Sequence, residues 1–403
     1  MRTICVLLLT GALAASAADR IPLFNGKDLS GWMMTGPGRF VVENGMLKTE
    51  GGMGLLYYNG MRFGNQTLRV VFKTASPNAN SGVYIRMADP PADPWYGVHN
   101  GYEVQIDAGG DDWHCTGSLY SLSKVTKRTQ KHMGEWNTMD VELSGQKTTV
   151  YLNGEKINEF SGDQPVPVRH QWFEPVRGPR PDYGYIGVQN HDARSTVYFK
   201  EVSVVIPDGW KVLSQHDRDM AMSYLHATRK QFLDAVSGLS PEQWIYRPGP
   251  GRWSIAEVAE HIAITEEGLF QYLDKGLSGP QATGLTRTMS DEDWIKMVTD
   301  RSHKAKAPEA FVPTGRWTRE ELVAEFLRRR DANIEYVSRT LNNLRGTLIK
   351  GPMGVIDCYQ GFLMIPAHCE RHLAQIQEVR EAAGFPKSVA PKPSSPKPGS
   401  PKE

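Results

Sequence analysis

The chain has 403 residues, of which 40% are hydrophobic and 23% charged, a composition typical of globular proteins rather than disordered ones. At this length we expect more than one domain, because one hydrophobic core rarely serves more than about 250–300 residues. The formal net charge of +1 excludes the strongly basic surface typical of nucleic-acid-binding proteins. The four cysteines are too few for a disulfide scaffold.

The first residues have the order of a secretory signal peptide. Basic Arg2 precedes the apolar stretch 4–15, and Ala15, Ser16 and Ala17 supply a small-residue cleavage site. The stretch is too short to span a membrane, and no later segment approaches about 18 uninterrupted apolar residues. We therefore predict an exported mature protein, periplasmic or extracellular, with no membrane span. Cleavage removes one cysteine and leaves an odd number, so at least one thiol in a single chain is unpaired.

The region that follows has the pattern of β-strands. Short alternating or β-branched runs lie between clusters of Gly, Asn, Pro and Asp, as where Met139, Val141 and Leu143 alternate with Asp140 and Glu142. Many antiparallel strands without interleaved helices predict a β-sandwich. The expected strands are 68–72, 83–85, 102–106, 139–143, 148–152, 185–189 and 196–205.

The pattern then becomes helical. Capping boxes at Ser254 with Glu257 and at Thr318 with Glu321 mark the starts of two long helices. Long helices joined by Gly- and Pro-containing loops predict a four-helix bundle, with an extra helix near 291–303. The predicted division of the chain is a signal peptide over 1–17, a β-sandwich over 18–207, a linker over 208–213, a helical bundle over 214–385 and a solvated Pro/Lys/Ser tail over 386–403.

Strand alternation predicts a polar face on the sandwich. Glu103 and Gln105 oppose the apolar residues of their strand, and neighbouring strands are expected to add similar groups. Planar hydrogen-bonding groups beside an aromatic ring suit a polyhydroxylated ligand such as a sugar. The alternative is an ordinary solvated outer face. The predicted face consists of Tyr84, Arg86, Glu103, Gln105, Gln189 and His191.

Six motifs in this region resemble, in the same order, the 3-keto-disaccharide hydrolase family. They are IPLFNGKDLSGW at 21–32, NSGVYIR at 80–86, GYEVQI at 101–106, TGSLY at 116–120, GEWN at 134–137 and GYIGVQNH at 184–191. The resemblance covers about residues 20–206. It implies a concanavalin-A-like β-sandwich (jelly roll) that hydrolyses glycosides whose sugar carries a ketone at C3.

A ketone at C3 acidifies the C2 proton, so a base can remove it and the C1 aglycone can leave before water adds back. We predict Glu103 or His191 as the base and Arg86 as the partner of the enolate oxygen. A direct two-carboxylate mechanism, pairing Glu103 with Asp107 or Glu135, is the alternative. A metal requirement of the sandwich stays open. The expected substrate contacts are Tyr84, Gln105, Tyr120 and Gln189.

Three histidines suggest a metal site in the bundle. His368 and His372 are four residues apart and share a helix face, although a pair of surface histidines is the simpler explanation. The motifs WSIAEVAEH at 253–261 and HCERHLAQI at 368–376 resemble the DinB/YfiT-like bundle family over about residues 212–385. That resemblance implies a divalent metal with open positions on His261, His368 and His372, and imidazole ligands suit Zn²⁺ or Ni²⁺.

Two further positions in the bundle carry expectations. Glu266 lies about one turn beyond His261, where it is either an acceptor behind the metal ligands or a solvated carboxylate. Pro366 must kink the last helix or lie in its first turn.

The leading hypothesis is an exported hydrolase of keto-modified glycosides with a metal-binding accessory bundle. A non-catalytic carbohydrate-binding sandwich fused to a metal-stabilised interaction bundle is the second hypothesis, and activity residing in the metal-dependent bundle is the third.

Overall fold

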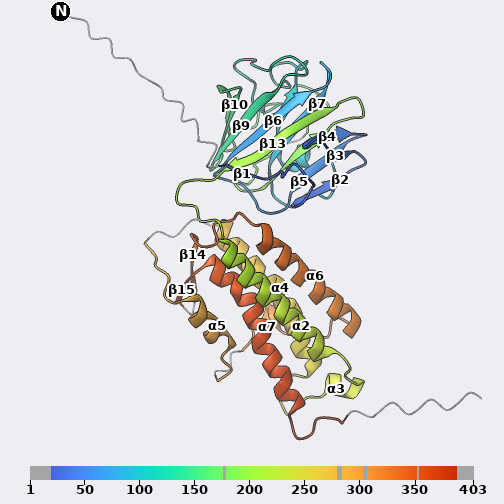
Figure 1. The fold of residues 1–403 in the computed structure, drawn as a ribbon, viewed down its shortest axis with the longest axis vertical. Coiled ribbons are helices and arrows are strands. Elements are labelled where there is room, and N and C mark those ends of the chain that lie inside the picture. Colours follow the sequence, from blue (N-terminus) through green and yellow to red (C-terminus); the bar gives the residue numbers. More distant parts are fainter. Residues whose placement is uncertain (1–19, 176–177, 279–283, 303–305, 352–353, 388–403) are drawn as a thin grey trace, which may run out of the picture. The chain divides into compact units, whose positions relative to one another are not determined.

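The computed structural model describes residues 20–175, 178–278, 284–302, 306–351 and 354–387 (Figure 1). The predicted signal peptide and nearly all of the predicted tail lie outside the described residues. The chain divides into two compact units, Met1–Trp210 and Lys211–Glu403. Within the described ranges, no helix is long and apolar enough to cross a membrane.

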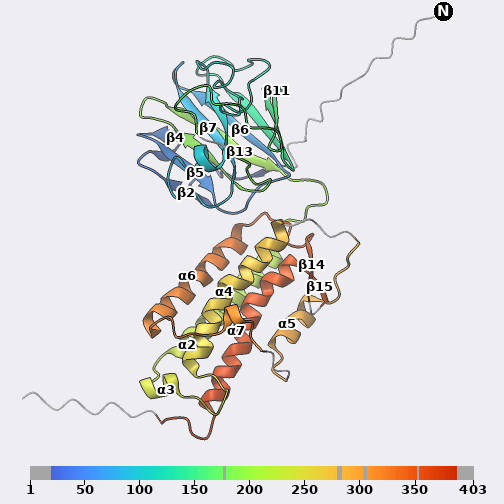
Figure 2. The same cartoon turned by 180° about the vertical axis from the view of Figure 1, so that it is seen from behind.

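The first unit is a sandwich of two antiparallel sheets (Figures 1 and 2). The 8-stranded sheet has the order β11-β10-β9-β6-β13-β4-β3, with β1 also paired to β13, and the 5-stranded sheet has the order β2-β5-β12-β7-β8. The short helix α1 (Tyr96–Asn100) packs against β7 and β8. The strands are β1 Arg20–Pro22, β2 Trp32–Thr35, β3 Arg39–Glu43, β4 Met46–Glu50, β5 Gly54–Tyr58, β6 Thr67–Thr74, β7 Asn80–Met87, β8 Tyr102–Asp107, β9 Asn137–Ser144, β10 Lys147–Leu152, β11 Glu155–Ser161, β12 Tyr185–Asn190 and β13 Val197–Val205.

The predicted sandwich is confirmed, and its core follows the expected alternation. Met139, Val141 and Leu143 of β9 are buried, whereas Glu142 is exposed. Each predicted strand coincides with an observed one, but β1 to β5 and β11 were not predicted. In β5 all five residues are buried, so the alternation that identifies a half-buried strand is absent there.

The second unit is the predicted helical bundle. Helices α2 (Gln215–Val236), α4 (Ile255–Ser278), α6 (Arg319–Arg339) and α7 (Cys358–Arg380) run side by side in Figures 1 and 2. Both α2 and α4 pack against α6 and α7, and the four helices enclose two clusters of buried apolar side chains. The smaller elements are α3 Pro241–Ile245, α5 Asp291–Thr299, the 3-10 turn Glu309–Phe311 and a hairpin of β14 Leu348–Gly351 and β15 Gly354–Asp357.

Local sequence signals account for the helix ends. The predicted capping boxes form, with the Glu257 backbone N–H donating to Ser254 Oγ at 3.3 Å and the Glu321 N–H to Thr318 Oγ1 at the same distance. Pro366 lies inside α7 rather than in its first turn, so the first-turn alternative is wrong. The three described cysteines are free and buried.

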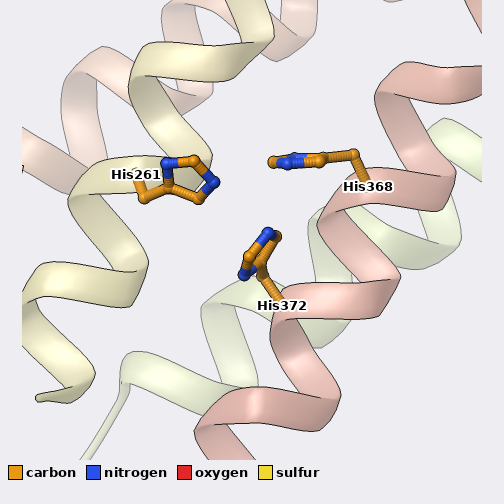
Figure 3. A group of neighbouring side chains, drawn as sticks. All are labelled: His261, His368 and His372. Atoms are coloured by element: carbon orange, nitrogen blue, oxygen red, sulfur yellow. The ribbon is translucent and has the colours of Figure 1, made fainter. Parts of the chain in front are cut away.

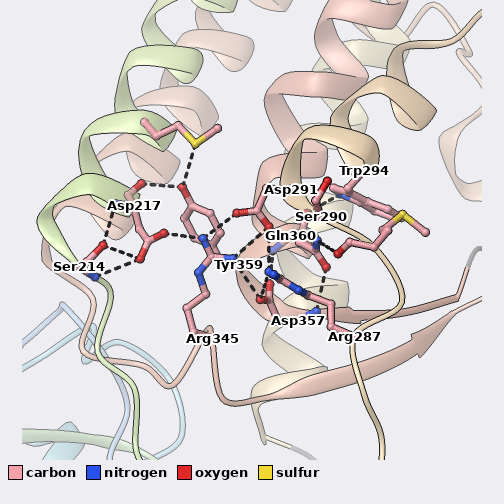
Figure 4. A network of polar contacts seen from close by, with 12 residues as sticks. Ser214, Asp217, Arg287, Ser290, Asp291, Trp294, Arg345, Asp357, Tyr359 and Gln360 are labelled. Carbon is pink, nitrogen blue, oxygen red and sulfur yellow. Dashed lines mark hydrogen bonds and ion pairs between the residues drawn. The ribbon is translucent and has the colours of Figure 1, made fainter.

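One arginine joins several elements at one end of the bundle (Figure 4). The Arg345 guanidinium contacts Asp217 of α2, Asp291 of α5 at 2.7 Å and Asp357, the N-cap of α7, at 3.1 Å. It also lies 3.9 Å from the centre of the Tyr359 ring. Because the side chain is only 19% exposed, these charges are poorly screened by water.

We predict that Arg345→Met lowers the free energy of unfolding of the bundle by about 2–3 kcal/mol, because it leaves Asp217 without a counter-charge and leaves Asp291 and Asp357 to share Arg287 alone. Urea unfolding followed by helical circular dichroism measures the effect. The matched control is Arg339→Met, which removes an exposed arginine paired within one helix and should cost about 0.5 kcal/mol or less. Equal losses in the two variants would contradict this prediction.

Candidate functional site

Three imidazoles converge between two helices of the bundle (Figure 3). His261 projects from α4 toward His368 and His372 of α7. One ring nitrogen from each histidine lies within 4.8 Å of the other two. The predicted grouping is therefore present in the structure, and it holds the geometry of a three-nitrogen ligand set.

Each imidazole is oriented by a hydrogen bond from its Nδ1. His261 Nδ1 donates to the Phe311 carbonyl oxygen at 2.7 Å, and His372 Nδ1 donates to Gln375 Oε1 at 2.8 Å. His368 Nδ1 lies 3.2 Å from Thr265 Oγ1, whose own proton goes to the His261 carbonyl oxygen, so the imidazole is the donor. All three Nε2 atoms thereby keep a free lone pair.

Burial keeps these histidines neutral. It lowers the pKa of His261, and it lowers that of His368 further, with the neighbouring His372 and His261 adding to the effect. Burial followed by the proximity of His261 lowers the pKa of His372 to about 3. Neutral imidazoles with free Nε2 atoms are what a divalent metal requires, so these residues fit such an ion.

The two expectations for Glu266 are both wrong. Its side chain is 1% exposed, so it is not solvated, and it pairs with Arg330 rather than supporting a histidine. The histidine supports come instead from Phe311, Thr265 and Gln375. Sequence spacing did not reveal Phe311, because it lies 50 residues from the histidine that it orients.

In the sandwich, Glu103 of β8 is a buried carboxyl group. It is 6% exposed, and burial raises its pKa to about 8, while a hydrogen bond from Gln189 acts in the opposite direction. Gly82 on the paired strand β7 provides the space, since a Cβ atom there would lie 2.2 Å from Glu103 Oε1. A carboxyl group with a pKa near 8 can exchange a proton at physiological pH.

Several predicted contact residues surround Glu103. Gln189 donates to the Tyr84 hydroxyl, and the Gln105 side-chain amide lies next to the Glu103 carboxylate, 2.9 Å from Oε1. The backbone N–H of Tyr120 donates to the Glu103 carbonyl oxygen at 2.8 Å. The expectation of a solvated outer face is wrong, because Tyr84, Gln105 and Gln189 are all buried. The Tyr84 ring packs under Gly97 of α1, so it offers no open stacking surface.

The prediction that Arg86 shares this face is wrong. Arg86 has a φ of +59°, which breaks the alternation of β7. Its guanidinium is directed to the other sheet, where it donates to the carbonyl oxygens of Gly145 at 2.6 Å and Lys147 at 3.1 Å. Arg86 therefore joins strands and is no partner for an enolate oxygen beside Glu103.

The other candidates form their own contacts rather than bonding to Glu103. His191 is half-exposed and bonds Asp192 through Nδ1 at 3.0 Å. Asp107 accepts from the backbone N–H of Gly109, and Glu135 lies in an exposed turn before β9. No hydrogen bond or ion pair joins His191, Asp107 or Glu135 to Glu103 in the described part of the chain.

A second polar group lies close by and was not predicted. His114 contacts Asp111 through Nδ1 at 2.8 Å and Glu174 through Nε2 at 3.1 Å, and Glu174 is buried. The His114 ring meets the Tyr120 ring edge-on at 5.1 Å, which brings it next to the Glu103 cluster. These residues come from loops 60 positions apart, where no periodicity relates them.

Comparison with known families and structures gives separate matches for the two parts of the chain. Residues 19–205 match the 3-keto-alpha-glucoside-1,2-lyase-like domain, and residues 224–376 match the DinB superfamily. No curated protein matches.

Similar solved structures include two crystal structures of a "putative glycosyl hydrolase" from Parabacteroides distasonis ATCC 8503. Both are 24% identical to this chain. The match to the first covers 46% of this chain and 98% of the matched chain, with a TM-score of 0.39. The match to the second covers 48% of this chain and 95% of the matched chain, with a TM-score of 0.40. The carbohydrate-binding module CBM66 from Bacillus subtilis is 16% identical and covers 43% of this chain and 94% of its own, with a TM-score of 0.30.

Proposed function

Because residues 19–205 form a 3-keto-disaccharide hydrolase-like domain and residues 224–376 a DinB-superfamily domain, we propose that this protein cleaves glycosides of 3-keto sugars. The sandwich carries the reaction, and the bundle is a metal-binding accessory domain. The observation that supports the sandwich as the reacting domain most strongly is the burial of Glu103, which raises its pKa to about 8.

The proposed reaction is an elimination followed by hydration. The Glu103 carboxylate removes the proton from C2, and the electron pair becomes the enolate of the C3 ketone. Collapse of the enolate forms a C1–C2 double bond and breaks the bond from C1 to the aglycone oxygen, which takes the proton from Glu103. Addition of water then gives the free 3-keto sugar. A pKa near 8 suits a group that takes and returns one proton.

The enolate oxygen needs a hydrogen-bond donor, and the Tyr84 hydroxyl, which accepts from Gln189 and so keeps its own hydrogen to donate, takes this role in place of Arg86. The amide of Gln189 donates to both Tyr84 and Glu103, and the amide of Gln105 donates to Glu103, so the two amides hold the hydroxyl donor and the base side by side. Such a donor stabilises charge that develops in a site shielded from water. Gln189 Oε1, an acceptor, is buried and has no hydrogen-bond partner, which fits an atom that would accept from a hydroxyl group of the sugar.

The test uses a 4-nitrophenyl 3-keto-glucoside and the full chain in D₂O. Elimination and hydration place deuterium at C2 of the product, whereas a direct two-carboxylate displacement leaves C2–H intact. The unoxidised 4-nitrophenyl glucoside should not be cleaved, since its C2 proton is not acidic. Cleavage of both substrates without deuterium incorporation would reject the elimination in favour of the two-carboxylate mechanism.

The competing functions give different results in the same assay. A non-catalytic carbohydrate-binding sandwich shows binding but no turnover. Activity in the bundle predicts that His368→Ala abolishes turnover, whereas our proposal predicts that it does not.

We further propose that the bundle holds one Zn²⁺ or Ni²⁺ on His261, His368 and His372, with open positions for other ligands. His368→Ala and His372→Ala should each lower metal content from roughly one ion per chain to near zero and abolish the thermal stabilisation by added Zn²⁺. Plasma mass spectrometry and thermal unfolding measure both effects. His226→Ala, elsewhere on the bundle, is the control. Wild-type protein without metal and without a thermal shift would refute the metal site.

Export, the third part of the proposal, rests on the basic, apolar and small-residue order of residues 1–17. Fractionation of the native host should recover the protein, shortened after Ala17, from the periplasm or the medium.

A further inference from the structure

A cavity of about 870 Å³ adjoins the three histidines, and its walls are mainly apolar. This volume is within the range of about 300–1,000 Å³ typical of small-molecule sites. The walls come from α4, α5 and α7, from residues 251–253 before α4 and 300–301 after α5, and from the segment 306–312. The larger apolar side chains in the walls are Trp253, Leu269, Met297, Val298, Phe311 and Met364.

The wall formed by the segment 306–312 is held in place by buried groups. The Phe311 carbonyl oxygen accepts a hydrogen bond from His261 Nδ1. The buried carboxylate of Glu260 accepts from the backbone N–H groups of Thr314 at 2.9 Å and Gly315 at 2.8 Å. The Phe311 ring packs on Gly268 of α4, where a Cβ atom would lie only 2.2 Å from it. The cavity is therefore preformed.

Positive charge dominates the polar part of the lining. Arg252, Arg301, Lys306 and Arg371 line the cavity, and Asp300 is the one carboxylate among the lining residues that the structure describes. Arg252 and Arg301 pair with Glu378. Lys306 is exposed and forms no ion pair with any residue in the described ranges. A bound divalent ion would add to this charge.

Neutral hydrogen-bonding side chains are scarce in the lining. Among the described lining residues they are Thr265 and Gln375, which already bond the Nδ1 atoms of two histidines, and Trp253 with its single indole N–H. A polyhydroxylated sugar would leave most of its hydroxyl groups without partners against these apolar walls. A neutral apolar molecule would gain nothing from the cations.

We propose that this cavity binds a small amphipathic anion, with an apolar body against Leu269, Met297 and Met364 and an anionic oxygen group directed to Lys306 and to the divalent ion proposed on the three histidines, so the inference rests on that metal site. This ligand class differs from the glycoside of the sandwich, so the inference does not depend on the proposed glycoside cleavage. It makes the bundle a ligand-binding domain in its own right.

The test compares acids with matching alcohols by calorimetry on the full, zinc-loaded chain. Octanoate and 2-naphthoate should bind at least about tenfold more tightly than octanol and 2-naphthol, and glucose should give no heat. If neither acid binds, or if the alcohols bind as tightly as the acids, the proposal is wrong.

Variants locate the binding. Met297→Trp, at a partly exposed position of α5, fills the cavity and should weaken both acids at least about tenfold. Lys306→Glu should weaken the acids about five- to tenfold and leave the alcohols unchanged. Lys350→Glu on β14, exposed and outside the cavity, is the charge-matched control.

Zinc content is measured in every variant, so that lost binding is not confused with lost metal. Unchanged acid binding in Met297→Trp and Lys306→Glu at full zinc content would overturn the assignment to this cavity. Glycoside turnover, assayed on the same samples, reports on the sandwich alone.

Discussion

Replacing Glu103 with glutamine is expected to lower turnover of a 3-keto-glucoside by about 10²–10⁴-fold while the sandwich stays folded. Glutamine has nearly the same shape and keeps a hydrogen-bonding end, but it takes no proton from C2. Substrate binding should persist, because the amides of Gln105 and Gln189 and the hydroxyl of Tyr84 are untouched. Stopped assays of aglycone release and binding calorimetry measure the two effects.

The same substitution is expected to change how stability depends on pH. The pKa of Glu103 is raised to about 8 in the folded protein, against an ordinary value of about 4.3. The folded state therefore holds a proton that the unfolded state releases. This contribution to stability is complete below about pH 4.3 and is lost as pH rises through about 8. Wild type should lose about 2–4 kcal/mol relative to Glu103→Gln between pH 5 and pH 9.

The turnover of the wild type should rise with pH, whereas its stability falls. A base must be ionised to act, so kcat/KM of the wild type should rise with pH and level off above about pH 8. Glu142→Gln, which alters an exposed carboxylate on the outer face of β9, is the control for both measurements. Full turnover in Glu103→Gln, or a pH profile that is flat from pH 6 to 9, would remove Glu103 from the reaction.

The sequence predicted the fold and the site best in segments where a single helical or strand periodicity determines which side chains share a face. The spacing of His368 and His372 places them on one turn of α7, and the motif around His261 supplies the third imidazole. The alternation of Met139, Val141 and Leu143 likewise placed β9 in the correct register with the core. In these segments the local pattern and the tertiary packing agree.

The sequence predicted poorly where tertiary contacts override that pattern. Arg86 adopts a left-handed backbone conformation, which a sequence normally signals by a glycine. Its side chain is therefore on the face opposite to the expected one. His114 and Glu174 meet through irregular loops, and Phe311 reaches His261 through a backbone carbonyl. No regular spacing in the sequence predicts such contacts, because the path of a loop is determined by the elements against which the loop packs.

The buried ion pair of Glu266 and Arg330 should have the largest effect on the stability of the bundle. The two side chains are 1% and 0% exposed, and Arg330 Nε lies 3.0 Å from Glu266 Oε2. Arg330 also donates to the Leu225 carbonyl oxygen at 2.7 Å, and Asn333 donates to Glu266 at 3.1 Å. Burial disfavours the charged guanidinium, but the Glu266 carboxylate outweighs this and raises the pKa of Arg330.

Glu266→Ala should therefore lower the free energy of unfolding by about 3–5 kcal/mol, because it leaves a buried guanidinium without its counter-charge. The double variant Glu266→Leu with Arg330→Met should recover much of that loss, since neither partner remains charged and apolar groups fill the space. Urea unfolding followed by helical circular dichroism measures both. The control is Arg328→Ala, which breaks an exposed pair with Glu325 and should cost about 1 kcal/mol or less. A double variant that is less stable than Glu266→Ala would show that the pair itself stabilises the bundle, contrary to the expectation that its charges only compensate one another.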